Sequence, residues 1–228
     1  MTDKLRLRLP KLDARLQAVA NRVPKCALAA DIGADHGRLA CWLLGQGICQ
    51  RMIISDISPD SLNKARRLLA RHGLQDRADF VVADGLAAVT KRVDTVVIAG
   101  IGGETMVEIL AGHHRIGDAR LVLSAQTETD RVRRALAEYG YRLDCEDVVS
   151  AAGRFYTVIT AERGTARYTD KQVAIGPTLR STESASVLDY LLWRVCVLSA
   201  GRDEQKKQQL QWLSEEIERA KANESTDL

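Results

Sequence analysis

The chain has 228 residues, 46% of them hydrophobic, which is enough for one complete α/β domain and a smaller appendage. No apolar run approaches the ~18 residues that a membrane span needs, and charges interrupt the N-terminal leucines, so we expect neither a membrane anchor nor a signal peptide. The net charge is only +3, yet residues 1–180 carry 27 Lys and Arg against 21 Asp and Glu. The most basic stretch, 4–25, suits a polyanionic partner such as nucleic acid, or else a solvated helix face.

The five cysteines are an odd number and include no Cys-x-x-Cys pair. Most of them lie inside apolar runs, so we expect reduced, buried thiols, as is usual in a cytoplasmic protein. His113 and His114 are the only adjacent pair of histidines, and no carboxylate or thiolate stands beside them. We therefore predict no metal site.

Hydrophobic residues at helical spacing predict a short amphipathic helix over 11–23, ahead of a regular alternation of strands and helices. The strand-like runs are 27–32, 52–55, 80–83, 95–99 and 121–124, and the helical segments between and after them are 38–44, 59–71, 103–111 and 128–139. Ser58 can cap the helix that Pro59 begins. Alternation at this pitch predicts a parallel sheet with helices on both faces.

Two strand-like runs, 141–149 and 154–160, end this alternation. They are rich in Val, Tyr, Phe and Ile and are joined by Ser-Ala-Ala-Gly, which predicts a β-hairpin. A doubly wound sheet that ends in an antiparallel hairpin is typical of class I S-adenosylmethionine-dependent methyltransferases. The predicted fold class is therefore α/β, with a class I (Rossmann-like) methyltransferase sheet and a terminal antiparallel hairpin.

The chain changes character after this hairpin. Residues 164–182 are polar and include Gly-Pro, which is typical of a linker. Leucine-rich stripes at 188–198 and 210–220 then flank Gly201 and indicate two helices in an antiparallel α-helical hairpin, a short coiled coil. We therefore divide the chain into a cofactor-binding domain over 1–163, a linker over 164–182 and a C-terminal helical hairpin over 183–228.

The loop that follows the first predicted strand is the most informative segment of the chain. A strand that ends in Asp-x-Gly and turns tightly into a helix is how doubly wound proteins hold an adenosine-containing cofactor, because glycine lets the backbone approach the ligand. We expect Asp31 and Gly33 to bind the cofactor. Asp35, followed by His36, replaces the middle glycine of the common Asp-x-Gly-x-Gly-x-Gly loop. The loop therefore does not provide the Gly-x-Gly-x-x-Gly of dinucleotide-binding domains.

Acidic residues or glycines also follow the next three strands. Asp56 lies about 20 residues after the first loop, where it can accept hydrogen bonds from both ribose hydroxyls, and we expect its neighbour Ile57 to contact the cofactor. Asp84 and Gly85 end the third strand, where a carboxylate can accept a hydrogen bond from the adenine amine. Gly100 ends the fourth strand, and in methyltransferases the residues at this position face the methyl group of the cofactor. Because ligands bind at the carboxyl ends of such strands, these residues predict one cofactor site.

The motifs Ala-Asp-Ile-Gly-x-Asp-His, Ser-Asp-Ile-Ser, Ala-Asp-Gly-Leu and Ile-Ala-Gly-Ile-Gly-Gly resemble the bacterial tRNA (adenine-22-N1)-methyltransferase family, and the likeness covers nearly the whole chain. It implies S-adenosyl-L-methionine as cofactor, tRNA as partner and methyl transfer to N1 of an adenine. Adenine N1 carries a free lone pair, so no base has to uncover the nucleophile, but the ring must be extruded from its stack. The methylated ring is cationic, and a nearby carboxylate would stabilise that charge.

Within this resemblance, Asp35 is the candidate catalytic residue, because it occupies the glycine position nearest the cofactor, and Glu104 is the second candidate. His36 is expected to orient or contact the cofactor. An alternative role for Asp35 is to cap the helix that begins near Gly37. Five arginines are candidate phosphate contacts: Arg15, Arg38, Arg131, Arg133 and Arg134.

The chain departs from the family pattern at two places. Ile101 stands where the family usually has Met, and Leu123-Ser124-Ala125-Gln126-Thr127 ends the fifth strand where the family typically reads Leu-Gln-Pro-Asn. The second departure borders the substrate side, so one alternative hypothesis is a methyltransferase that acts on another RNA site or on a small molecule. Another is a non-catalytic module that binds RNA or protein. We expect a cytoplasmic monomer or weak dimer.

Overall fold

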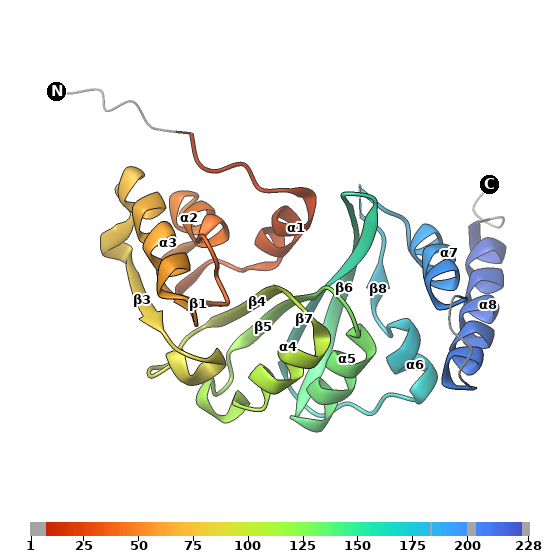
Figure 1. Ribbon diagram of the computed structural model, residues 1–228. Helices are drawn as coiled ribbons and strands as arrows, with labels where there is room; N and C mark the ends of the chain where they lie inside the picture. Colours follow the sequence, from red (N-terminus) through yellow and green to blue (C-terminus); the bar gives the residue numbers. More distant parts are fainter. Residues whose placement is uncertain (1–7, 183, 200–203, 225–228) are drawn as a thin grey trace.

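Within residues 8–182, 184–199 and 204–224, which the computed structural model describes, eight strands form one sheet in the order β3-β2-β1-β4-β5-β7-β6-β8 (Figure 1). They are β1 (Cys26–Ile32), β2 (Cys49–Asp56), β3 (Ala78–Val82), β4 (Thr95–Ile101), β5 (Arg120–Ala125), β6 (Tyr141–Ala151), β7 (Arg154–Arg163) and β8 (Leu179–Arg180). Strands β1 to β5 pair in parallel, whereas β7 runs antiparallel to both β5 and β6. The predicted α/β sheet with a terminal antiparallel hairpin is thereby confirmed.

The winding direction reverses between β1 and β4. The chain runs from β1 outward through β2 to β3 and then returns to place β4 on the other side of β1. Such a reversal leaves a crevice at the carboxyl ends of the two strands, and open α/β sheets bind their ligands there.

Helices cover both faces of this sheet (Figure 1). On one face lie α1 (Ala14–Arg22), α2 (Arg38–Gly45) and α3 (Pro59–Arg71), and on the other lie α4 (Gly103–Leu110) and α5 (Thr129–Glu138). Side chains alternate along each strand, so Met52 and Val97 join one buried cluster while Ile53 and Val96 join the other. Three short 3₁₀ turns complete this part: η1 (Gln75–Arg77), η2 (Gly85–Ala88) and η3 (His113–Arg115).

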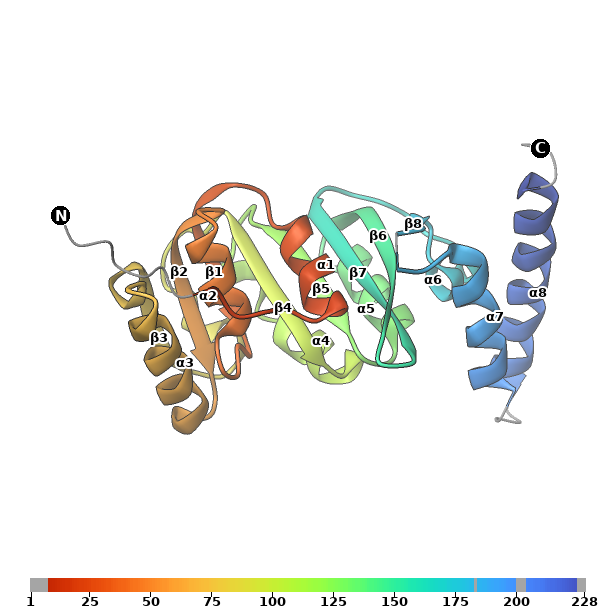
Figure 2. The same ribbon diagram turned by 90° about the horizontal axis from the view of Figure 1, so that it is seen from above.

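Side-chain caps set where two of these helices begin. The Ser58 hydroxyl accepts a hydrogen bond from the Ser61 amide at 3.2 Å and Pro59 follows it, as predicted. Helix α1 begins at Ala14, later than predicted, because the Asp13 carboxylate accepts from the Leu16 amide at 2.8 Å. The helix lies across β5, β6 and β7, as Figure 2 shows from above.

The segment expected to be a linker contains regular structure. Helix α6 (Asp170–Ile175) begins with a capping box in which Thr169 and Gln172 bond reciprocally. Strand β8 then pairs in parallel with β6 and extends the sheet. Residues 164–182 therefore pack on the sheet over part of their length, which their polar composition did not indicate.

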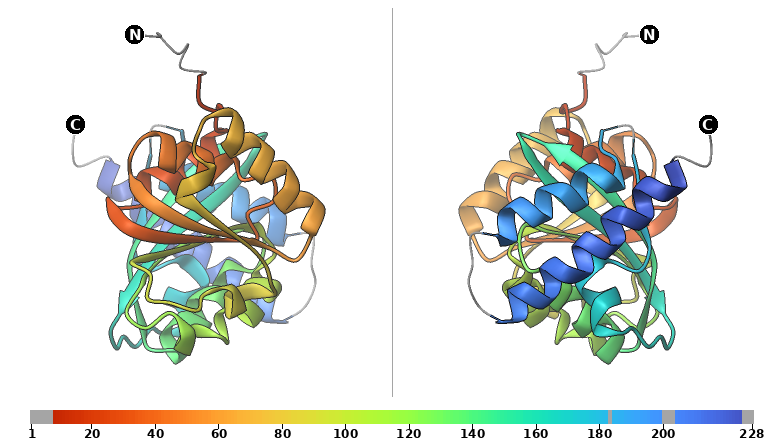
Figure 3. Two further views of the ribbon diagram at one scale, coloured as in Figure 1. Left: turned by 90° about the vertical axis from the view of Figure 1, so that its left-hand side faces the viewer. Right: turned by 90° about the vertical axis from the view of Figure 1, so that its right-hand side faces the viewer.

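Helices α7 (Val187–Leu198) and α8 (Glu204–Glu224) lie side by side beyond β8 (Figure 3). Leu191, Leu213 and Ile217 are buried with Val148 of β6, so the pair packs on the hairpin end of the sheet. Both predicted helices are present, and Gly201, expected to separate them, lies outside the described residues.

The expectation of buried cysteines is met only in part. Three cysteines are buried, but Cys26 is half-buried and Cys196 is exposed. Across the described ranges, no helix is long and apolar enough to cross a lipid bilayer. The same residues contain no cluster of three or more His, Cys, Asp or Glu side chains that could hold a metal ion.

Candidate functional site

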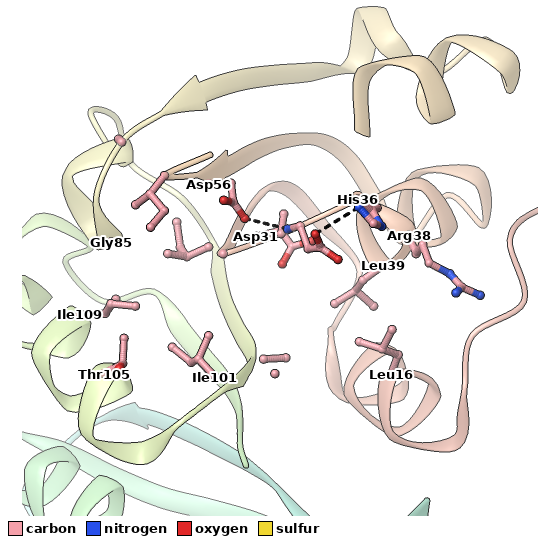
Figure 4. Close-up of a pocket in the computed structure, with 18 of the residues that line it drawn as sticks. Leu16, Asp31, His36, Arg38, Leu39, Asp56, Gly85, Ile101, Thr105 and Ile109 are labelled. Atoms are coloured by element: carbon pink, nitrogen blue, oxygen red, sulfur yellow. Dashed lines mark hydrogen bonds and ion pairs between the residues drawn. The ribbon is translucent and has the colours of Figure 1, made fainter. Parts of the chain in front are cut away.

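A cavity of about 470 Å³ opens at the carboxyl ends of β1, β2 and β4, and we call it the switch-point cavity (Figure 4). All nine residues predicted for the site line it: Asp31, Gly33, Asp35, His36, Asp56, Ile57, Asp84, Gly85 and Gly100. They lie at or just beyond the carboxyl ends of four strands, which parallel pairing brings together. The wall also contains residues that no motif indicated, notably Leu16 of α1, Leu39 of α2 and Thr105 and Ile109 of α4.

The first loop takes its shape from left-handed backbone. Gly33, Asp35 and Gly37 have φ values of +69°, +48° and +66°. A side chain at Gly37 would be blocked, because its Cβ would lie 2.7 Å from the Ala65 Cβ. The Asp35 amide donates to Oδ2 of Asp56 at 2.9 Å, which fixes the loop to the end of β2. Asp35 thus occupies a conformation that favours glycine, next to the cavity.

The Asp35 carboxylate is largely open to solvent, with 70% of its side chain exposed. Its Oδ1 lies 3.4 Å from the Ser61 hydroxyl, which donates to it, and 3.4 Å from Nε2 of His36. Helix α2 has Gly37 as its N-cap and no side chain caps it, so the alternative in which Asp35 caps this helix is wrong.

Asp31 is the buried acid of the site, with only 4% of the residue exposed. Burial raises its pKa to about 7, and the neighbouring negative charge of Asp56 adds to the effect. The carboxyl therefore gains or loses its charge near neutral pH, and a cation placed beside it would favour the charged form.

Asp56 and Asp84 keep acceptor capacity for a ligand. Oδ1 of Asp56 accepts from the Ser58 amide at 2.9 Å, but each carboxylate oxygen has a second lone pair. Asp84 is exposed, and its side chain does not cap η2. Ile57 beside them is 72% exposed and lines the cavity, so its side chain is open to a ligand there.

Gly100 and the guanidinium of Arg15 lie next to each other in the wall of the cavity. Gly100 has a φ of +87° and lies where the pairing of β4 with β5 shifts register. A Cβ at this position would lie 3.4 Å from both Nη atoms of Arg15. The Arg15 guanidinium also lies over the Tyr156 ring, 5.7 Å from its centroid, and its buried Nη1 has no hydrogen-bond partner among the residues that the structure describes.

The lining therefore combines four carboxylates, two arginines and several apolar side chains. The volume lies within the range of small-molecule sites. S-adenosyl-L-methionine carries a sulfonium and an ammonium cation, which suit this acidic wall, and an adenosine whose ribose and amine suit Asp56 and Asp84. The residues present fit this cofactor.

Not every predicted contact lies at the site. Glu104 does not line the cavity and instead lies 3.2 Å from Arg131. Arg133 cannot contact phosphate, because its side chain is 1% exposed and pairs with the buried Glu146 at 2.6 Å. Its prediction as a phosphate contact is wrong.

The other candidate arginines are engaged but accessible. Arg134 is paired with Asp170 at 3.0 Å on the surface. Arg38 lines the cavity while it donates to the carbonyl of Lys11. Of the basic N-terminal stretch, Lys4 and Arg6 lie outside the described residues.

Comparisons with known proteins agree on one kind of enzyme. A family model described as "Methyltransferase domain" matches residues 12–159. A tRNA (adenine(22)-N(1))-methyltransferase of Bacillus subtilis is 33% identical over 157 residues, which are 68% of this chain and 66% of that protein. A crystal structure of the B. subtilis m1A22 tRNA methyltransferase is 26% identical with a TM-score of 0.75, covering 92% and 97% of the two chains. A Streptococcus pneumoniae structure in complex with S-adenosyl-L-methionine is 25% identical with a TM-score of 0.81, covering 91% and 100%.

Proposed function

We propose, from the premise that this chain belongs to the bacterial tRNA (adenine-22-N1)-methyltransferase family, that it methylates N1 of the adenine at position 22 of tRNA. The observation that carries the proposal is the switch-point cavity, in which the ends of four strands present carboxylates suited to S-adenosyl-L-methionine. We propose that residues 1–163 are the catalytic unit. The segment 183–228 is then an accessory to it.

Each cofactor-binding residue has a role that follows from its position. Asp31 faces a cation of the cofactor. Gly33 has no side chain, so the backbone of the first loop can pass close to the cofactor. Asp56 accepts from the ribose hydroxyls, and Asp84 accepts from the adenine amine. Ile57 and Gly85 flank the ring, His36 holds the Asp35 carboxylate, and Gly100 opens the side on which the substrate base enters.

The chain's own contribution to the reaction is electrostatic and positional. When bound, S-adenosyl-L-methionine supplies an electrophilic methyl group. Adenine N1 needs no deprotonation, so the protein needs no general base. Asp35 stabilises the positive charge that develops on the base, and its exposed carboxylate at the cavity supports this role.

One observation favours a second candidate function. The loop that departs from the family pattern, Gln126 and Thr127, is exposed beside Gly103 at the start of α4. A methyltransferase acting on another adenine, or on another RNA, would differ there.

We propose a cytoplasmic enzyme, monomeric or weakly dimeric, with tRNA as its macromolecular partner.

Methylation of an unmodified tRNA transcript tests the proposal. After incubation with the protein and S-adenosyl-L-methionine, nucleoside mass spectrometry should detect 1-methyladenosine, and a transcript with guanine at position 22 should give none. Methylation of both transcripts would favour another RNA site. An unmodified position 22 in the first transcript would refute the leading proposal.

A further inference from the structure

A second cavity, of about 900 Å³, lies between the β5–α5 loop, the turn end of the β6–β7 hairpin and helix α7. We call it the hairpin cavity. It is lined by 125–131, 153–157 and parts of α7 and α8, and none of its lining residues belongs to the switch-point cavity. None of the nine residues predicted for the cofactor site lines it, although the departing loop residues Gln126 and Thr127 do.

Aromatic side chains form one wall of the hairpin cavity. The rings of Phe155 and Trp193 lie 5.7 Å apart, and Tyr190 lies 6.3 Å from each of them. Tyr190 is buried beneath, whereas Phe155 and Trp193 are partly exposed, and Val197 on the rim is 53% exposed. An open aromatic wall of this kind can stack on a nucleic acid base of any type.

Positive charge predominates around this wall. The lining contains four cations that are not buried, Arg131, Arg154, Arg194 and Lys206, and two carboxylates, Glu128 and Asp130. Arg133 also lines the cavity, but its charge is buried and paired with Glu146. Arg154 stands exposed beside the hairpin turn and forms no ion pair with any residue that the structure describes. Aromatic faces combined with cations are the usual means of binding an unpaired nucleic acid strand.

The two cavities adjoin at the carboxyl ends of β4 and β5. Tyr156 lines the hairpin cavity, and the guanidinium of Arg15, which lines the switch-point cavity, lies 5.7 Å from its ring centroid. On the other side, Thr127 lines the hairpin cavity, and its hydroxyl accepts at 3.4 Å from the amide of Gly103, the first residue of α4, which carries Thr105 of the switch-point cavity. The contact between Arg15 and Tyr156 places the two cavities next to each other, so one RNA strand can reach both.

We propose that the hairpin cavity holds the RNA nucleotide next to the target base, with its base stacked on Trp193 and Phe155 and its phosphate contacted by Arg154. The inference rests on the proposed function. Extruding the target adenine leaves its neighbour without a stacking partner, and an aromatic wall at this place replaces the lost contact. The excess of cations favours RNA as the occupant over an acidic peptide or an apolar helix.

Matched variants test this proposal on the full-length protein. Loss of one stacking contact in Trp193→Ala should weaken the binding of an unmodified tRNA transcript about five- to hundredfold, whereas Trp193→Phe should stay within about threefold. Arg154→Glu should weaken it at least about tenfold through lost and reversed charge. The control Arg67→Glu, an exposed arginine on α3 at the opposite end of the sheet, should change the Kd by less than about threefold.

Calorimetry with S-adenosyl-L-methionine separates the two cavities. All four variants should bind the cofactor within about twofold of the unmodified protein, because none of them lines the switch-point cavity. Unchanged tRNA Kd values for Trp193→Ala and Arg154→Glu would overturn the inference, as would a loss equal to that of Arg67→Glu. Arg154 is exposed, so its variant tests the idea even if Trp193→Ala fails to fold. Failure of the proposed function would be recognised separately, because the protein without substitutions would then form no 1-methyladenosine in the tRNA transcript.

Discussion

The buried carboxyl of Asp31 should make cofactor affinity depend on pH. Its pKa lies at about 7 because the protein excludes water around it and because Asp56 carries a like charge nearby. A cationic ligand prefers the ionised carboxylate, so the apparent Kd should contain the factor 1 + 10^(pKa − pH). With a pKa of about 7, affinity should rise about tenfold between about pH 6 and about pH 8.

Calorimetric titration with S-adenosyl-L-methionine across this range measures the slope. Asp31→Asn should bind more weakly at about pH 8 and lose most of the dependence, while His36→Gln, a variant of another ionisable residue of the cavity, should keep it. A slope of equal size in Asp31→Asn would refute the assignment. So would an affinity that falls as pH rises.

The same pKa shift has a consequence for the stability of the ligand-free protein. Because the pKa in the folded state is raised from 3.8 to about 7, the folded state binds more protons than the unfolded state between these values, and stability falls as pH rises through this window. The full shift corresponds to about 4 kcal/mol, so Asp31→Asn should resist denaturant better than the unmodified protein at about pH 8 and show no such advantage near pH 4. This gain also shows that weaker cofactor binding by the variant does not come from unfolding.

Three further predictions follow from single contacts. Asp35→Asn keeps a side chain that tolerates left-handed backbone but removes the negative charge. In a methyl-transfer assay kcat should fall about a hundredfold or more, while the Kd of the cofactor stays within about tenfold. Full activity of this variant would show that Asp35 has a structural role only. Gly103→Ala places a Cβ 2.5 Å from the Thr127 carbonyl oxygen and should cost about 1–3 kcal/mol in urea unfolding, whereas Gly102→Ala, whose Cβ would lie 3.4 Å from the Thr127 hydroxyl, should cost far less. Glu146→Gln leaves a buried guanidinium without its counter-charge and should cost about 3–5 kcal/mol by the same measurement; a loss below 1 kcal/mol would contradict the buried ion pair.

The switch-point cavity could be predicted because its geometry depends on local patterns. Strand length and the residues that end each strand are visible in the sequence, and parallel pairing then brings Asp31, Asp56 and Gly100 to one edge of the sheet. What the motifs could not reveal is the part of the wall contributed by α1. The position of Leu16 and Arg15 depends on how that helix lies across β5, β6 and β7, which no local spacing specifies.

The arginines of α5 show where prediction from the sequence stops. Arg131, Arg133 and Arg134 look alike in the sequence, and the apolar stripe of Val132 and Leu136 places position 133 at the edge of the buried face. A charge at that edge is either solvated or paired, and the outcome depends on Glu146, which approaches from another element of the fold. The hairpin cavity has the same origin, since Phe155 and Trp193 meet only because α7 packs on β6 and β7. A cavity that arises from such distant pairs becomes visible only once the chain is folded, which is why the hairpin cavity was harder to predict than the switch-point cavity.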